Sequence, residues 1–436
     1  MMIKKNNYHN FLLIASVLLI LMPLALISGP FLPDLFIVLI SFIFLFISNK
    51  EIQLFKLKSN FFIFFLIFYF YLILTSILSD NFYQSIKSSI TYLRFGLFSV
   101  AVFFILNNRK DFIKYFYLMM CFTIIILIFD GYFQFITGKN IFGYKTIRAD
   151  RISALFFDEL ILGSYLGKIL PIFLSFYMLN KGYFKKYYIL ILVLLSYILI
   201  FISGERSAFF TTTLYLIMVI PFLIGIKRSV ILFILIGTIF GTLISTNKNM
   251  KSRYIDQMLM HTLGIGKYSA QNRNVISGAT QTVTFMPDHI GLFSSALDIF
   301  KKNVFVGGGV KTFRIYCKDA VNEKLMALKK DLPNMLFCNT HPHNYYLQLL
   351  AETGLIGFLF VLAIFIKLFF NYLRQVYYLV KKNKSINAKY VIILSGLIIY
   401  IWPLTTTGSF FNNWICSILF LQIGVFLYIS ENESKN

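Results

Sequence analysis

The chain has 436 residues, of which 58% are hydrophobic and 18% aromatic, and its mean hydropathy is +0.75. This composition excludes an ordinary soluble globular domain and places the protein in a membrane. The formal net charge of +23 falls largely in loops between apolar runs, which indicates membrane topology and anionic lipid, and no nucleic-acid binding is expected.

Apolar runs long enough to cross about 30 Å of hydrocarbon recur along the chain, and they predict an all-α polytopic membrane protein. We expect about 12 transmembrane helices, the first retained and not a cleaved signal, at 11–29, 31–48, 61–79, 90–107, 113–137, 160–180, 187–203, 208–226, 229–246, 346–371, 389–407 and 411–430. The chain then divides into helices 1–9 (1–246), one large periplasmic loop or cap (247–345) and helices 10–12 (346–436).

Lysine and arginine fall in every second short loop, as at Lys50, Arg109, Lys185 and Arg228. Because basic residues close to helix ends stay in the cytoplasm, both termini are expected to be cytoplasmic. The large loop then lies on the outer face, which is the periplasm if the membrane is a bacterial inner membrane.

Four cysteines are present, and Cys121 and Cys416 lie within predicted spans. Cys317 and Cys338 lie in the outer loop, where an oxidising compartment allows a disulfide. Such a bond closes about twenty residues and stabilises the loop by on the order of 3 kcal/mol in the chain-entropy model.

The outer loop contains one segment with helical periodicity, at 289–303. Its apolar face predicts an amphipathic helix that lies on the membrane surface or caps the bundle. The following run of Gly307, Gly308 and Gly309 forms either a turn or an anion-binding nest of backbone N–H groups. No GK[ST] follows, which excludes a nucleotide P-loop.

Four of the five histidines lie in the outer loop, among them His261 and His289, and His343 directly precedes the tenth span. An imidazole at that interface, with an unperturbed pKa of about 6.5, can act as a base near neutral pH. The alternative is a ring that only hydrogen-bonds a loop carbonyl. His341 and His343 lack further ligands nearby, so no metal site is predicted.

SGERSAFF, residues 203–210, places Arg206 in the first turn of the eighth span. A cation there opposes the helix dipole unless an anion is shared, and that anion is either Glu205 or a phosphate group. The positive-inside rule does not explain an outer arginine, which favours the phosphate.

A third polar cluster, residues 143–163, precedes the sixth span and contains Arg151, a secondary candidate for phosphate binding. Asp158 and Glu159 lie where that span begins, a position that suits carboxylates. The alternative is a solvated loop with a well-capped helix.

These clusters, in this order, resemble the superfamily of O-antigen ligases and polymerases, which are polytopic membrane glycosyltransferases. His343 and Asn344, followed by nine residues and the sequence GLIG at 354–357, match the histidine motif of that family. SGERSAFF resembles its short outer motif with an essential arginine, which corresponds to Arg206.

Two places depart from the family pattern. In NVFVGGGVKTF, Val304 and Phe305 occupy the region of the family's proline. Where relatives carry a second outer arginine, this chain has His289, with Arg273 a little earlier, so the second phosphate-binding residue stays open between them.

The resemblance implies inverting transfer of a glycan from undecaprenyl pyrophosphate to a sugar hydroxyl, without a metal or other cofactor. His343 is then the general base, and Arg206 with a second cation stabilises the departing pyrophosphate. Asn344 and His341 shape the turn or orient their neighbour, and Gly354 and Gly357 allow close packing of the tenth helix.

Several functions fit this sequence. The motif and the late position of the loop favour a ligase, whose acceptor is the lipid A core, over a polymerase or a protein-glycosylating relative. A transporter or flippase is the alternative from another class, and it predicts charges near the bilayer midplane, for which Asp130 and Lys168 are candidates. A non-catalytic scaffold would tolerate the loss of His343.

Overall fold

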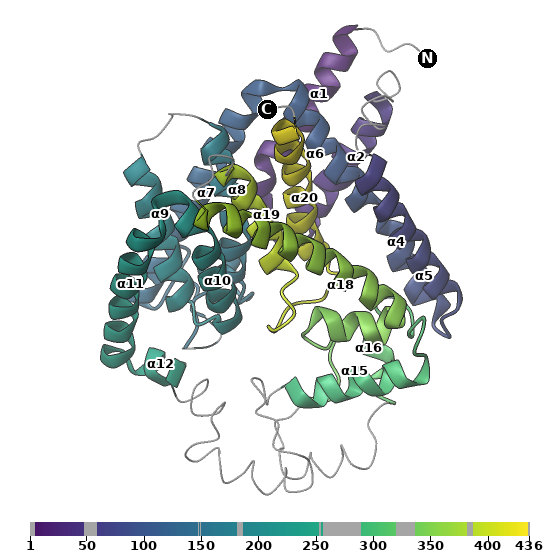
Figure 1. Cartoon of the computed structure of the whole chain (residues 1–436). Coiled ribbons are helices and arrows are strands. Elements are labelled where there is room, and N and C mark those ends of the chain that lie inside the picture. The colour runs from purple at the N-terminus through teal and green to yellow at the C-terminus, as the bar shows by residue number, and fades with distance from the viewer. Residues whose placement is uncertain are drawn as a thin grey trace, which may run out of the picture.

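A computed structural model gives the fold of residues 5–47, 59–146, 148, 150–180, 186–252, 254, 255, 289–319, 336–381 and 387–434. Most of these residues are helical, and they form no strand. The helices pack into one bundle around a continuous apolar core (Figure 1). The predicted class, an all-α polytopic membrane protein, is confirmed.

The long helices follow the predicted spans in order. Their bounds, with those of three short elements, are α1 (Lys5–Ala25), α2 (Phe31–Ile47), α4 (Ser59–Ile77), α5 (Phe82–Thr91), α6 (Leu93–Asn108), α7 (Lys110–Thr137), η2 (Ala154–Phe156), α8 (Leu162–Leu179), α9 (Lys186–Ile202), α10 (Arg206–Ile224), α11 (Ile226–Thr246), α12 (Lys248–Lys251), α15 (Ile290–Lys302), α16 (Phe313–Tyr316), α18 (Tyr345–Val380), α19 (Ala388–Tyr400) and α20 (Asn413–Ser434).

Nine helical segments in the described part of the chain are long and apolar enough to cross a membrane, with α5 and α6 together forming one of them. Three shorter apolar helices, α2, α9 and α19, occupy the other predicted spans. The protein is therefore a multi-pass membrane protein, and the count of twelve crossings stays a prediction.

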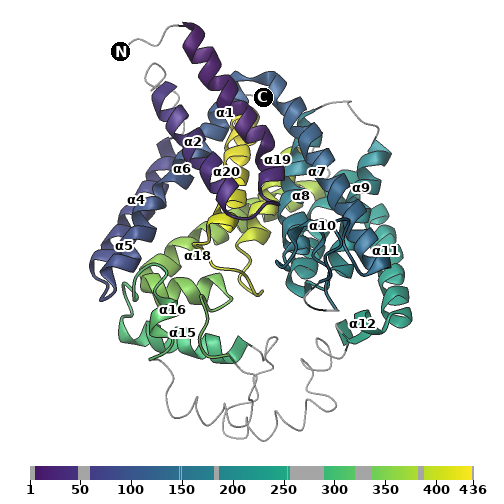
Figure 2. The same ribbon diagram turned by 180° about the vertical axis from the view of Figure 1, so that it is seen from behind.

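Both ends of the chain lie at one end of the bundle, and α15 and α16 lie at the opposite end (Figures 1 and 2). The predicted amphipathic helix exists as α15, and its apolar face packs against α16 and the start of α18. These contacts form a small second core of Leu292, Ala296, Ile299, Phe313, Cys317 and Ala351. This packing agrees with the expected capping of the bundle.

Helix α18 is broken at Gly354, where φ is 63° and ψ is −167°. Segment 304–309 lies against the break and holds both sides of it. The backbone hydrogen bonds run from Gly308 N to Ala351 O (2.9 Å), from Gly309 N to Glu352 O (2.8 Å) and from Leu355 N to Val304 O (2.8 Å). The break therefore has a fixed geometry.

The carboxyl group of Glu352 lies at the backbone after the glycine run. It accepts hydrogen bonds from Lys311 N (3.0 Å), Phe313 N (3.2 Å) and the amide of Gln348 (3.0 Å). The run Gly307 to Gly309 is thus a turn docked on α18, and an internal carboxyl group meets the N–H groups that follow it.

The two glycines of the histidine motif have different neighbours. A Cβ at Gly354 would lie 2.3 Å from Phe305 O, so this position admits the 304–306 backbone and not another helix. A Cβ at Gly357 would lie 3.2 Å from the ring of Tyr71 in α4 and 2.1 Å from Thr353 Oγ1. Of the two, only Gly357 lies close to another helix, at the Tyr71 ring of α4.

Replacing Gly354 with alanine is expected to destabilise the protein, because the backbone there lies in a region essentially restricted to glycine and Cβ would clash with Phe305 O. The backbone conformation alone costs about 1–3 kcal/mol. The unfolding temperature of purified protein in detergent measures this loss of stability. Gly237→Ala in α11, where no atom lies within 4 Å of the added Cβ, is the matched control, and equal unfolding temperatures for the two variants would contradict the assignment.

The predicted span 389–407 is too long. Helix α19 ends at Tyr400, and residues 401–412 form a loop that turns back into the bundle (Figure 1). The cause is Pro403, because a proline disfavours helical geometry in the residue before it. This loop is one wall of the site described next.

Candidate active site

A cavity of about 770 Å³ lies between α8, α10, α19, the start of α20 and the loop 401–412. Five residues that the sequence named as catalytic, phosphate-binding or positioning candidates line it: Arg151, Arg206, His289, His341 and His343. They come from four separate parts of the chain. Arg273, the remaining candidate cation, lies outside the described residues.

His343 occupies a tight turn immediately before α18, with φ at 57°. Thr407 N donates to its carbonyl at 2.9 Å, and Asn339 Nδ2 lies 3.2 Å from its Nε2. Burial lowers the pKa of His343, and a backbone hydrogen bond with Thr407 opposes this shift. The imidazole is therefore neutral near pH 7, the form that a general base requires.

The other two histidines lie beside His343. Ring centroids are 4.2 Å apart for His341 and His343 and 4.8 Å apart for His289 and His343. Burial, together with the neighbouring His343, lowers the pKa of His341 to about 3. His341 is consequently neutral and does not compete for a proton taken up by His343.

Asn344 caps α18 and joins it to the loop 401–412. Its Oδ1 accepts from Tyr346 N (3.0 Å) and Leu347 N (3.1 Å), and its Nδ2 donates to Pro403 O (2.9 Å) and Thr405 O (3.2 Å). Because both ends of the amide are occupied by the protein, Asn344 fixes the histidine turn.

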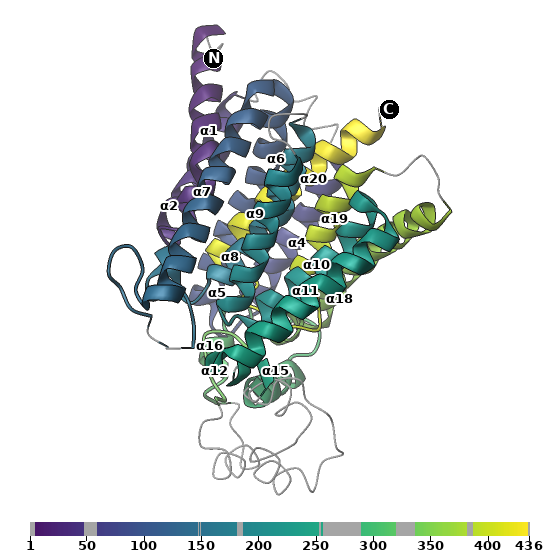
Figure 3. The ribbon, with the colours of Figure 1, turned by 90° about the vertical axis from the view of Figure 1, so that its left-hand side faces the viewer.

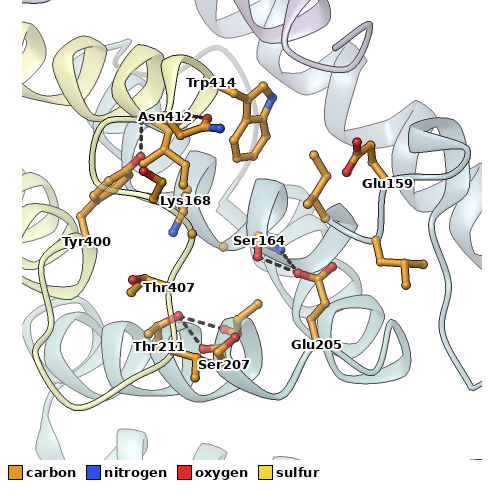
Figure 4. Close-up of a pocket in the computed structure, with 18 of the residues that line it drawn as sticks. Glu159, Ser164, Lys168, Glu205, Ser207, Thr211, Tyr400, Thr407, Asn412 and Trp414 are labelled. Atoms are coloured by element: carbon orange, nitrogen blue, oxygen red, sulfur yellow. Dashed lines mark hydrogen bonds between the residues drawn. The ribbon is translucent and has the colours of Figure 1, made fainter. Parts of the chain in front are cut away.

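Helix α10 begins at Arg206, as expected, and Glu205 immediately precedes it. The Glu205 carboxylate is directed at the start of α8, where it accepts from Gly163 N (2.6 Å), Ser164 N (3.0 Å) and Ser164 Oγ (2.6 Å) (Figure 4). Burial raises the pKa of Glu205, and Arg151 opposes that shift. Glu205 thus caps a neighbouring helix.

The capping of α8 differs from the expectation that Asp158 and Glu159 would serve this helix start. Both side chains are exposed, and α8 begins three residues after Glu159. Glu159 instead lines the cavity, and Glu205, from a distant part of the chain, meets the N–H groups of α8.

Arg151 is held by the loop before α10. Its Nε donates to Ser203 O (3.1 Å), one Nη donates to Leu160 O (2.9 Å), and Glu205 Oε1 is 4.0 Å away. Burial lowers the pKa of Arg151, and Glu205 opposes this shift. The guanidinium is therefore fixed at the cavity wall, with part of its donor capacity used by the protein.

Several lining residues had no assigned role in the sequence analysis, among them Thr405, Thr406 and Thr407. Lys168 of α8, which also lines the cavity, was named there only as a candidate charge for a transporter (Figure 4 labels Lys168 and Thr407). The available signals were a cluster of small polar residues inside an apolar stretch and a lysine inside an apolar helix. Neither signal indicates which site the residue joins.

Cys317 and Cys338 form a disulfide in the structure, with Cα atoms 5.0 Å apart. Cys338 directly precedes Asn339, the residue whose side chain meets His343. The bond joins the segment that leads into the histidine turn to the end of α16.

Removing this disulfide is expected to loosen the histidine turn and to lower thermal stability by on the order of 3 kcal/mol in the chain-entropy model. We expect Cys317→Ser with Cys338→Ser to unfold at lower temperature than wild type and to be insensitive to reductant. Thermal scans with and without reductant measure this, and Cys121→Ser, a free buried cysteine, is the control. A wild type whose unfolding does not respond to full reduction would contradict the prediction.

Together the fold and the cavity define a multi-pass membrane protein with arginines and histidines gathered in one cavity. Residues 190–362 match the family described as O-Antigen ligase. The resemblance to the O-antigen ligase and polymerase superfamily is thereby confirmed, and this family points to a membrane glycosyltransferase-like enzyme that uses lipid-linked glycans. The matched range includes Arg206 and His343. No curated protein sequence matches the chain.

Proposed function

We propose that the protein is an O-antigen ligase-like glycosyltransferase of the bacterial inner membrane. It moves a glycan from undecaprenyl pyrophosphate to a sugar hydroxyl of the lipid A core, with inversion and without a metal. The cavity faces the periplasm, both termini are cytoplasmic, and residues 247–345 form the periplasmic cap between the helical parts 1–246 and 346–436. The observation that carries the proposal is that His343 and Arg206 line the same cavity.

In this mechanism neutral His343 takes the proton of the acceptor hydroxyl as its oxygen attacks the anomeric carbon. The new glycosidic C–O bond forms while the bond between that carbon and the phosphate oxygen breaks. The electron pair leaves with undecaprenyl pyrophosphate, whose developing charge Arg206 stabilises. Arg151, which is held beside the start of α10 by Ser203 and Glu205, supports the second phosphate, and His289 or Arg273 completes the set of donors.

Three features of the described residues support this assignment of roles. The lowered pKa of His343 supplies the neutral base. Arg206 stands at the start of α10, where backbone N–H groups and a guanidinium favour the same anion. Asn344 and Thr407 hold the histidine turn at the cavity wall.

The deciding experiment is transfer by purified protein, in the presence of EDTA, from undecaprenyl pyrophosphate-linked glycan to lipid A core. Transfer to the core supports the ligase. Extension of the donor glycan without transfer to the core would favour a polymerase of the same superfamily, which differs only in its acceptor. No chemistry with either acceptor, together with movement of lipid-linked glycan across vesicles, would favour a flippase.

A further inference from the structure

The inner end of the cavity carries a cation that the proposed mechanism does not use. Along α8, Ser164, Lys168 and Pro171 all line the cavity, a spacing that places them on one face of the helix. Lys168 lies six residues beyond Leu162, which is about 9 Å farther along the helix axis from the start of α8. Figure 4 shows its amine directed into the cavity, between Tyr400 and Thr407.

The charge of Lys168 is only weakly balanced within the protein. Its Nζ lies 4.7 Å from the centroid of the Tyr400 ring, a cation–π contact that holds the ammonium in place. Glu205 is the carboxylate that acts on it electrostatically, but Glu205 already accepts three hydrogen bonds and lies 4.0 Å from Arg151. In the described part of the chain Lys168 forms no ion pair.

An amide from another helix lines the same inner end. Gln422 of α20 is 0% exposed, and neither its Nε2 nor its Oε1 has a hydrogen-bond partner within the described residues. Gly396 of α19 makes room for this amide, since a Cβ at Gly396 would lie 2.0 Å from Nε2. A buried amide without partners costs free energy that a polar ligand would recover.

We propose that Lys168 and Gln422 form an anion subsite at the inner end of the cavity, and that it binds a phosphate group of a polyprenyl-linked phosphate. The ammonium and the amide N–H supply donors for phosphate oxygens, and the apolar surroundings strengthen the charge-assisted hydrogen bonds. The identity of the lipid rests on the proposed function. Lys168 and Gln422 thus extend phosphate recognition from the arginines toward the bilayer interior.

Binding is measured by tryptophan fluorescence, because the chain has two tryptophans and Trp414 lines the cavity. In a Trp402→Phe background, protein in nanodiscs is titrated with undecaprenyl pyrophosphate. We expect Lys168→Met to raise Kd by about tenfold or more and Gln422→Leu by about threefold. Lys168→Arg, which keeps the charge, stays within about threefold of the parent.

Lys367→Met is the matched control, since Lys367 is an exposed lysine inside the apolar helix α18, and it should leave Kd unchanged. Titrations with inorganic pyrophosphate and with undecaprenol distinguish binding of the phosphate group from binding of the lipid chain. Competition by pyrophosphate that depends on Lys168 assigns recognition to the phosphate group alone, whereas Lys168-dependent binding only of the lipid-linked form assigns it to the lipid phosphate. Undecaprenol binding should not depend on Lys168.

Unchanged Kd in both Lys168→Met and Gln422→Leu, in protein that unfolds at the parent temperature, would overturn the subsite. A parent that does not bind undecaprenyl pyrophosphate would also overturn it. Transfer is assayed separately: Lys168-dependent binding without any transfer leaves the subsite standing and removes the proposed function. Normal transfer with unchanged binding in the variants removes the subsite alone.

Discussion

Replacing His343 with alanine is expected to lower glycan transfer by about 10²–10⁴-fold, the range that a positioned general base contributes. The ring lies at the cavity wall beside two other histidines, so its loss removes the proposed proton acceptor. Transfer to lipid A core by purified protein measures this. His9→Ala is the matched control, because His9 is an exposed histidine of α1 that is remote from the cavity in sequence. A His343→Ala enzyme with wild-type turnover would exclude this residue as the base.

The proposed role of His343 as general base also predicts how activity depends on pH. Because burial lowers the pKa of His343, the neutral form persists below the ordinary value of about 6.5. Activity should therefore be fully present at pH 7 and decline as the pH falls through the lowered pKa. The pH profile of kcat/KM measures this pKa. An inflection on the acid side that lies above the ordinary histidine value of about 6.5 would contradict the lowered pKa.

Replacing Arg206 with alanine is expected to lower kcat/KM by about 10²–10³-fold, the effect of removing one donor from a site that stabilises developing negative charge. Glycan transfer by purified protein measures this loss, with Arg206→Ala and wild type compared at equal amounts of folded protein.

Two further variants serve as comparisons for Arg206→Ala. Arg206→Lys keeps the charge without bidentate geometry and should retain part of the activity. Arg228→Ala removes an exposed arginine near the start of α11 and should leave transfer unchanged. Arg151 is less suitable for this test because it also binds the backbone of Ser203 and Leu160. Full activity in Arg206→Ala would rule out a role in stabilising the pyrophosphate.

Local pattern predicted the features that depend on local physics. The apolar runs predicted the helices, because a backbone within lipid must satisfy its own hydrogen bonds. The periodicity of 289–303 gave α15, and the sequence around Arg206 and His343 placed each at the start of a helix. These assignments needed no knowledge of which segments meet.

Long-range pairing was not predictable in the same way. Glu205 caps a helix that begins more than forty residues earlier, whereas the local rule pointed to Asp158 and Glu159. Most of the loop 401–412 fell within the two predicted spans 389–407 and 411–430, and its role became apparent only through its contacts with Asn344 and His343. A polar residue in an apolar run indicates that its side chain has a polar contact in the fold, but the sequence does not identify which residue provides it.

The break in α18 joins the histidine turn to a long apolar segment. Residues 355–380 form the long segment beyond Gly354, about 39 Å at 1.5 Å per residue, and Figures 1 and 3 show α18 inclined to α1. Segment 304–309 forms hydrogen bonds with both sides of the break. We therefore expect residues 355–380 and the histidine turn to move together. A thicker or thinner bilayer changes the tilt of such a segment, so membrane thickness becomes a variable that adjusts the height of His343 above the acyl chains.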